Sequence, residues 1–353
     1  EYLNYTGNST LADLRRSNGH DAPYNVSFWG VGNESWGCGG NMTPEFYSNQ
    51  YKRYAEFCKD YPGTQLKKIA SGSNGDDYNW TEVCMKNIPA QNMWGISMHY
   101  YTIAGTWSNK GSATDFDESR YFQGLKSCLH IEDLINKHSA IMDKYDPQKK
   151  VVLAVDEWGI WTDVEPGTNP AFLYQQNSLR DALIAASTLN IFNDHCDRVK
   201  LASLAQTVNV LQSLVLTDKE KMVLTPTYYV FDMYKYHQDA TLMPVKFSSP
   251  EYSYGGESIS SVNASASKDS NGVIHITLVN IDPKNKINVS ANMKGENLKQ
   301  AEAEVLTSQK FNDINTFEQP DKVKPSLFSD YKKNGNNISV NLPPMSVVLI
   351  TLK

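Results

Sequence analysis

The chain has 353 residues, and at about 150 residues per domain this length predicts about two domains. Its 33 Lys and Arg against 39 Asp and Glu give a formal net charge of −6, which argues against binding of a nucleic-acid backbone, because that requires clustered positive charge. No apolar run approaches the roughly 20 residues of a membrane span, so we expect a globular protein with no membrane partner. The 20 Tyr, 12 Phe and 7 Trp suit a protein that stacks on sugar rings, although a large core would use the same residues.

Cysteine and histidine spacing gives no sign of a metal site. The five cysteines form no C-x-x-C pair, so neither a zinc ribbon nor a disulfide framework is predicted. The seven histidines show no H-x-H or H-E-x-x-H pattern, and we expect neither a metal nor a cofactor. The first residues lack a signal-peptide layout. The compartment is not determined, and a periplasmic or secreted location is favoured over the cytoplasm, which is the alternative.

Residues 1–238 alternate short apolar runs with long amphipathic stretches. We predict strands over 25–31, 66–70, 94–98, 151–155 and 199–205, and helices over 43–61, 122–145, 179–189 and 226–237. The first helix has the start signal Thr43-Pro44-Glu45, an N-cap followed by proline and an acidic residue. Strands that alternate with helices in this way are typical of a parallel α/β fold.

From residue 239 onward the helical periodicity disappears. Short alternating segments at 274–278, 338–342 and 346–352 are separated by turn clusters such as Asp269-Ser270-Asn271-Gly272. We therefore predict a second domain over 239–353, an antiparallel β-sandwich of the jelly-roll kind.

Polar residues follow the apolar strands of the first half. They are Asn33-Glu34, His99, Tyr101, Asp156-Glu157 and Gln206. In a parallel α/β barrel the loops after the strands converge, and the active site forms there. One carboxylate at a strand end is more often a cap or a surface residue. Two glutamates at the ends of different strands favour a site for acid/base chemistry.

Two competing motifs do not fit their structural context. Gly30-x-Gly32-x-x-Ser35 resembles a dinucleotide-binding loop, but its third position is Ser and the helix starts only near Thr43, so no helix N-terminus would hold the pyrophosphate. Gly95-x-Ser97-x-His99 lacks the last glycine of a nucleophile elbow and lies inside a predicted strand. His138, on a helical face, is interpreted as a structural histidine.

Several segments, in order along the chain, resemble glycoside hydrolase family 51, the α-L-arabinofuranosidases. They are Leu14-Arg15-Arg16-Ser17-Asn18-Gly19-His20, Asn33-Glu34-Ser35-Trp36-Gly37-Cys38-Gly39-Gly40-Asn41-Met42, Met98-His99-Tyr100-Tyr101, Asp156-Glu157-Trp158-Gly159 and Ala205-Gln206-Thr207-Val208-Asn209. The resemblance implies an α/β fold, a (β/α)8 TIM barrel with a C-terminal β-sandwich. It also implies that Glu34 is the acid/base, Glu157 the nucleophile, and that Asn33, His99, Tyr101 and Gln206 line the sugar subsite, with Trp161 on the leaving-group side.

The expected function is that of a retaining exo-α-L-arabinofuranosidase acting on arabinoxylan, arabinan or derived oligosaccharides. An endo-β-glucanase or xylanase on the same barrel is the nearest alternative, because a fold does not fix a substrate. A non-catalytic carbohydrate-binding fragment is a second alternative, although the presence of both glutamates argues against it.

Counting the strand before Asn33-Glu34 as the fourth, the sequence accounts for strands four to eight of the barrel. The first three units, about 95 residues at about 31 per unit, are not in the sequence. We therefore expect an N-terminal companion segment that completes the barrel, and we leave a homo-oligomer open.

Overall fold

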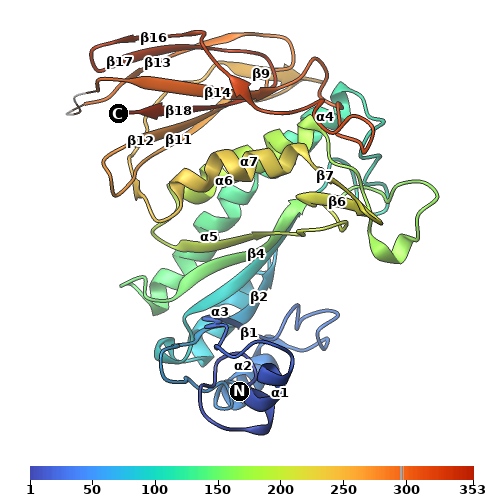
Figure 1. Ribbon diagram of the computed structural model, residues 1–353, viewed down its shortest axis with the longest axis vertical. Helices are drawn as coiled ribbons and strands as arrows, with labels where there is room; N and C mark the ends of the chain where they lie inside the picture. Colours follow the sequence, from blue (N-terminus) through green and yellow to red (C-terminus); the bar gives the residue numbers. More distant parts are fainter. Residues whose placement is uncertain (295, 297) are drawn as a thin grey trace. The chain divides into compact units, whose positions relative to one another are not determined.

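The computed structural model describes residues 1–294, 296 and 298–353 (Figure 1). The chain forms two compact units. Unit 1 contains residues 1–100, 133–156 and 197–202, and unit 2 contains residues 101–132, 157–196 and 203–353.

A parallel five-stranded sheet is the first layer of the fold. Its strand order is β1 (Phe28–Val31), β2 (Lys67–Asn74), β3 (Gly95–Thr102), β4 (Val152–Ile160) and β5 (Val199–Leu204). In unit 1, β1 pairs with β2 from Phe28 opposite Lys67 to Val31 opposite Ala70. The boundary between the units crosses β3, β4 and β5, so that the carboxyl ends of these strands belong to unit 2. Five consecutive strands in sequence order confirm the predicted parallel half-barrel.

Edge strand β1 is much more exposed than its neighbours. Phe28, Trp29 and Gly30 of this strand are exposed, whereas five consecutive residues of β2 and of β3 are buried. A strand of a closed parallel barrel is covered on both faces, and β1 is not.

The helices of unit 1 begin at strong caps. In α2 (Pro44–Ala55) the Thr43 side chain accepts a hydrogen bond from the Phe46 N–H, as the start signal predicted. The helix ends at Ala55, earlier than predicted, because the next amide groups bond three residues back in a tighter turn. Tyr54, near the end of this helix, is 59% exposed. Two helices were not predicted: α1 (Thr10–Ser17) and α3 (Tyr78–Asn87).

The single helix predicted over 122–145 is two helices in the structure. They are α4 (Glu118–Leu129) and α5 (Ile131–Tyr145), separated at His130. The Asp117 side chain caps α4 by accepting from the Arg120 N–H. Periodicity alone does not reveal a one-residue break, because both helices carry similar amphipathic patterns.

In unit 2, α6 (Leu179–Asp194) is buried along almost its whole length. It starts at a capping box formed by Ser178 and Asp181, and it packs against α4, α7 (Pro226–Tyr234), β11 (Val262–Lys268) and β12 (Ile274–Asn280). Short elements complete this unit: η2 (Pro170–Phe172), η3 (Lys235–His237) and the hairpin β6 (Val215–Asp218) with β7 (Lys221–Leu224), while η1 (Ala90–Asn92) lies in unit 1.

The C-terminal half of unit 2 consists of antiparallel sheets. A six-stranded sheet has the order β15 (Ser326–Leu327), β14 (Ala301–Thr307), β18 (Ser346–Leu352), β12 (Ile274–Asn280), β11 (Val262–Lys268) and β8 (Thr241–Leu242). A three-stranded sheet has the order β13 (Ile287–Asn292), β17 (Asn337–Leu342) and β16 (Tyr331–Asn334), and β9 (Glu251–Tyr254) pairs with β10 (Glu257–Ser260).

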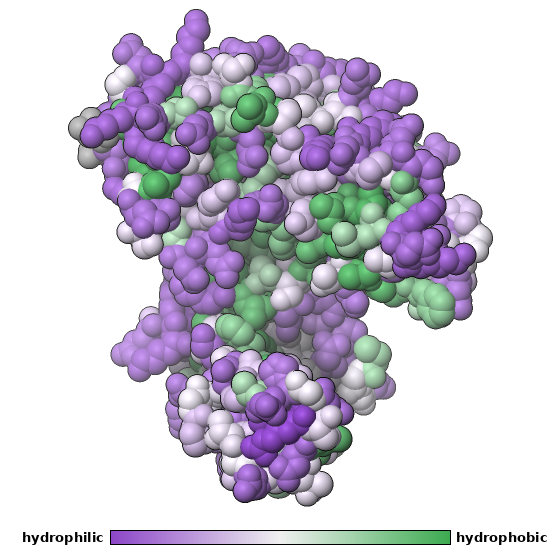
Figure 2. All heavy atoms as spheres, in the orientation of Figure 1, coloured by the Kyte–Doolittle hydropathy of each residue, from purple (hydrophilic) through white to green (hydrophobic). Residues whose placement is uncertain are grey.

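One hydrophobic core joins the two larger C-terminal sheets. Ile276 of β12 and Ile350 of β18 belong to the same buried cluster as Ile338 and Val340 of β17. The surface over β13, β16 and β17 is mainly hydrophilic (Figure 2), in keeping with the exposed Asn288 and Asn337. The alternating residues that predicted β17 and part of β12 are those that fill this core.

Within the described residues, no helix combines the length and the apolar character that crossing a membrane requires.

Candidate active site

Glu34 lies in a tight loop directly after β1. Its backbone φ of +42° is in the left-handed region. The hydroxyl of Tyr47 holds the start of this loop, since it donates to the Val31 carbonyl at 2.7 Å and accepts from the Ser71 N–H at 2.5 Å. Burial raises the pKa of Tyr47, so this hydroxyl remains a neutral donor and acceptor. The loop therefore presents Glu34 from a fixed backbone.

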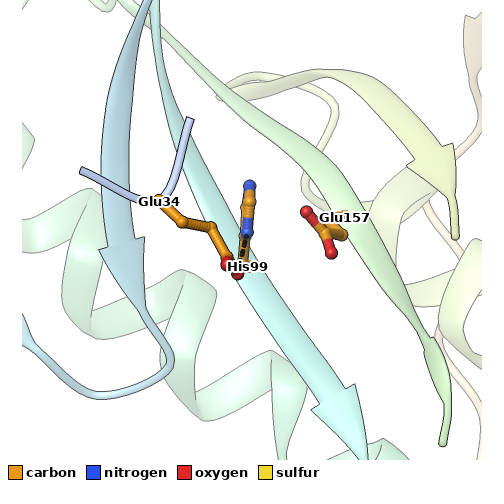
Figure 3. A group of neighbouring side chains, drawn as sticks. All are labelled: Glu34, His99 and Glu157. Carbon is orange, nitrogen blue, oxygen red and sulfur yellow. Dashed lines mark hydrogen bonds and ion pairs between the residues drawn. The ribbon is translucent and has the colours of Figure 1, made fainter. Parts of the chain in front are cut away.

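His99 connects two carboxylates in unit 1. It is 3% exposed on β3, and its Nδ1 lies 3.0 Å from Glu34 Oε1 (Figure 3). Its Nε2 lies 3.2 Å from Oδ1 of Asp156 on β4. A ring placed between two carboxylates orients the Glu34 side chain.

Glu157 is the next residue of β4 and belongs to unit 2. It is half-buried, and Oε1 of its carboxylate accepts a hydrogen bond from the Tyr101 hydroxyl at the end of β3. Tyr101 was predicted as a sugar-binding residue. That role stays a prediction, and what the structure shows is the hydroxyl of Tyr101 orienting the carboxylate of Glu157.

Aromatic side chains surround Tyr101 in unit 2. Its ring lies edge-on to Trp161, with centroids 4.8 Å apart. Trp161 in turn lies 5.0 Å from Trp107, and the ammonium of Lys110 lies over both indoles at 4.5 and 5.4 Å. Trp107 is 62% exposed, so this cluster offers flat apolar surface to a ligand.

The remaining predicted residues occupy the expected strand ends. Asn33 precedes Glu34 in the loop after β1, and Gln206 follows β5, and both are exposed.

His138 is buried and its ring nitrogens face the Thr81 hydroxyl at 2.9 Å and the Gly75 carbonyl at 2.7 Å. Burial lowers its pKa, as expected of the structural histidine that the sequence predicted.

An imidazole flanked by carboxylates is a donor set that a divalent cation can use. In unit 1, Nδ1 of His99 is hydrogen-bonded to Glu34 and Nε2 lies 3.2 Å from an oxygen of Asp156, so this chain's own carboxylates already flank the ring. We assign no metal ligand here.

Sequence reasoning gave no role in the site to three contributors. Cys38 donates to Glu34 Oε2 at 3.1 Å, Asp156 faces His99, and Trp107 extends the aromatic cluster of Trp161. Cys38 and Asp156 lie in the motifs that carried the family resemblance, which is the signal that pointed to them. Trp107 lies in a loop without a periodic pattern, so only the fold reveals its position.

Two family models match the chain. The α-L-arabinofuranosidase C-terminal domain matches residues 156–346, and the α-L-arabinofuranosidase 1 domain matches residues 1–120. An intracellular exo-α-L-arabinofuranosidase of Bacteroides ovatus is 47% identical over 354 aligned residues. The alignment covers all of this chain and 69% of that protein.

Solved structures agree with these matches. The family 51 arabinofuranosidase of Xanthomonas axonopodis pv. citri superposes with a TM-score of 0.96 at 47% identity, covering all of this chain and 71% of that one. The α-L-arabinofuranosidase of Thermotoga maritima in complex with arabinose gives 0.80 at 26% identity, covering 99% of this chain and 71% of that one. The family models match most of the chain, and the strand-end glutamates and the parallel half-barrel agree with them. This chain therefore belongs to the α-L-arabinofuranosidases of glycoside hydrolase family 51.

Proposed function

We propose that this chain carries the catalytic residues of a retaining exo-α-L-arabinofuranosidase, which removes terminal α-L-arabinofuranosyl groups from arabinoxylan, arabinan or derived oligosaccharides. The observation that carries the proposal is the placement of Glu34 and Glu157 at the carboxyl ends of different strands of one parallel sheet, each held by a hydrogen-bonding partner. The relative of Bacteroides ovatus, which bears the name of this activity, supports the same assignment.

In the proposed first step, Glu157 attacks the anomeric carbon and forms a covalent glycosyl-enzyme. The hydroxyl of Tyr101 donates to one oxygen of Glu157, which orients the carboxylate and leaves the other oxygen for attack. Glu34, in its protonated form, transfers its proton to the leaving oxygen. Retaining enzymes of this kind place the two carboxyl groups about 5–5.5 Å apart.

In the second step, Glu34 acts as the base. It removes a proton from a water molecule, which attacks the anomeric carbon and releases the sugar with its configuration retained. His99, bonded to Oε1 of Glu34, holds the carboxyl group in one rotamer through both steps. The role of acid and the role of base are thus carried by the same group.

Substrate binding in this proposal divides between the two sides of the scissile bond. Asn33, His99, Tyr101 and Gln206 line the subsite of the arabinofuranosyl group. Trp161 stacks on the leaving-group side, and Trp107 with Lys110 enlarges that surface.

We also propose that the active fold is a complete (β/α)8 barrel (residues 1–238 with a companion segment) followed by a jelly-roll-like β-sandwich (residues 239–353). The exposed edge of β1 supports a further strand beside it. A groove of about 380 Å³ along this edge supports a further helix, because it is lined by aromatic side chains such as Trp29, Tyr51, Tyr54 and Phe57. These features match surfaces that a preceding β/α unit covers in a closed barrel.

Three substrates assayed side by side test the proposed activity on the protein with its barrel complete. We expect turnover of an aryl α-L-arabinofuranoside, little turnover of an aryl β-xyloside, and none of cellulose. Preferential hydrolysis of cellulose or xylan in mid-chain would favour the endo-acting alternative. Release of a sugar with inverted configuration would exclude the double displacement.

A further inference from the structure

The two carboxylate oxygens of Glu34 have different partners in unit 1. Oε1 faces the ring of His99 at 3.0 Å, and Oε2 accepts a hydrogen bond from the Cys38 thiol at 3.1 Å. Cys38 is exposed, so its contribution is not that of a buried side chain filling space in a core. Its position beside Glu34 is the feature that needs explanation.

The loop that carries Cys38 is closed around Glu34. The Glu34 carbonyl accepts from the N–H of Gly37 at 2.8 Å and from the N–H of Gly39 at 3.0 Å. A Cβ atom on Gly39 would lie 1.7 Å from the Asn33 carbonyl oxygen, so only glycine fits there. These contacts fold the loop back on Glu34 and hold the Cys38 thiol within hydrogen-bonding distance of the Glu34 carboxylate.

We propose that Cys38 is a positioning residue that assists proton transfer by Glu34, an inference that rests on the proposed function. When Glu34 gives its proton to the leaving oxygen, negative charge develops on its carboxylate. The Cys38 S–H donates to one oxygen and stabilises that charge, while His99 holds the other oxygen. The thiol remains intact throughout, and no bond to sulfur forms or breaks.

The charged and titratable groups near Glu34 must be considered together. Within unit 1 they are Cys38 in its own loop, His99 on β3 and, through His99, Asp156 on β4. Replacing Cys38 leaves the other groups in place. The effect of the thiol can therefore be measured by itself, provided that the rotamer of His99 is unchanged.

The dependence on the leaving group separates this role from a merely structural one. Stabilising the charge on Glu34 matters for a poor leaving group, such as the sugar of an arabino-oligosaccharide, and much less for an activated aryl group that needs little protonation. A hydrogen bond to a charged group is stronger than one between neutral groups, but a thiol is a weak donor, so we take about tenfold as the expected effect.

On the protein with its barrel complete, the experiment compares kcat/KM of the wild type with that of Cys38→Ala and Cys38→Ser on both kinds of substrate. Cys58→Ala is the matched control, because the Cys58 thiol donates to the backbone carbonyl of Tyr54 instead of a carboxylate. We expect Cys38→Ala to lose about tenfold on the oligosaccharide and less than about twofold on the aryl substrate. We expect Cys38→Ser, which keeps a donor, to recover most of the loss, and Cys58→Ala to behave as wild type.

Equal losses on both substrates, or no recovery in Cys38→Ser while circular dichroism matches wild type, would overturn the role of the thiol. Wild-type levels on both substrates in Cys38→Ala would overturn it as well. Failure of the proposed function gives a different result, because the wild-type protein would then release arabinose from neither substrate.

Discussion

At the scale of single residues, the proposed roles of Glu34 and Glu157 differ in a measurable way. Glu157→Gln should nearly abolish turnover of every substrate, because no covalent intermediate can form. Glu34→Gln should lose about 10²–10⁴-fold on poor leaving groups but far less on activated aryl substrates. Steady-state kinetics on both substrate types measures the difference. Equal losses by both variants on both substrates would show that the roles are wrongly assigned.

The hydroxyl of Tyr101 is a second test at this scale. It donates to Oε1 of Glu157, and hydrogen bonds to charged groups contribute about 1.5–3 kcal/mol, so Tyr101→Phe should reduce kcat/KM by about 10- to 100-fold. Tyr145→Phe is the control, because the Tyr145 hydroxyl donates to the Glu82 carboxylate at 3.1 Å on the exposed surface. An unchanged rate in Tyr101→Phe would show that this hydroxyl does not orient the nucleophile.

The residues of the site were predictable to different extents. Glu34 and Glu157 follow recognisable apolar strands and lie in specific motifs, so their candidacy could be read from the sequence. The contacts between the site residues could not be read from the sequence. The contact of His99 with Asp156 depends on which strands are neighbours. The contact of Cys38 with Glu34 depends on a loop whose backbone is left-handed at Glu34. Apolar patterns carry no information on either.

At the scale of elements, the residue after α5 and the residue before β5 are joined by a buried ion pair in unit 1. Arg198, 1% exposed, lies 3.0 Å from Oδ2 of Asp146, which also accepts from the Val151 N–H at 2.7 Å. Asp146→Ala leaves the arginine buried without this partner and should lower the free energy of unfolding by about 3–5 kcal/mol.

Asp143 provides a matched comparison for that prediction. It also pairs with Arg198, but its side chain is 43% exposed, so Asp143→Ala should cost at most about 1 kcal/mol. Denaturant unfolding of both variants measures the two effects. Similar losses would show that burial does not determine the strength of this pair.

His237 makes the contact between η3 and the C-terminal sheet sensitive to pH. Its nitrogens face the hydroxyls of Ser267 at 2.8 Å and Thr277 at 3.1 Å, and burial lowers its pKa to about 4. Since the unfolded histidine takes up its proton near pH 6.5, the folded state loses up to about 3 kcal/mol as the pH falls from 6.5 to 4.

The difference between the wild type and His237→Gln isolates this effect. Asp194, whose pKa burial raises to about 6, contributes with the opposite sign, but it is present in both proteins and cancels. We expect the free energy of unfolding to fall more steeply for the wild type than for His237→Gln between pH 6.5 and 4, with His130→Gln, at an exposed position, following the wild type. Parallel curves for wild type and His237→Gln would contradict this account.

Strand β12 shows that an alternating apolar pattern predicts a strand but does not predict which of its faces are buried. Ile274, Ile276 and Leu278 predicted an inward face, and they do belong to the core. The intervening Thr277 is also buried, because its hydroxyl donates to Asn190 of α6 at 2.7 Å. A helix covers the face that the alternating pattern assigned to solvent, and this long-range contact is not contained in the local sequence.

At the scale of the whole molecule, the half-barrel leaves the β1 edge and its aromatic groove exposed. Phe57 is 76% exposed and Tyr54 is 59% exposed in that groove. Exposed edge strands beside apolar surface favour association, so we expect this chain by itself to aggregate and to be inactive, and to become monodisperse and active with the segment that completes the barrel. Light scattering with an aryl arabinofuranoside assay tests this, and an active, monodisperse preparation of this chain alone would contradict it.

The five-stranded parallel order was predictable because alternating strands and helices permit few topologies, since right-handed crossovers place each new strand beside the previous one. Which surfaces the chain leaves open was not predictable from the pattern of its residues. That depends on the edge position of β1, which becomes clear only when the strands are paired.

Identification of the residue that becomes covalently attached to the sugar tests the central claim most directly. In Glu34→Gln, an activated aryl α-L-arabinofuranoside can still form the glycosyl-enzyme, but hydrolysis lacks its base, so the intermediate accumulates. Peptide mass spectrometry of the quenched reaction should then find one arabinosyl group on Glu157. An arabinosyl group on a different residue, or no adduct together with an inverted product, would contradict the account.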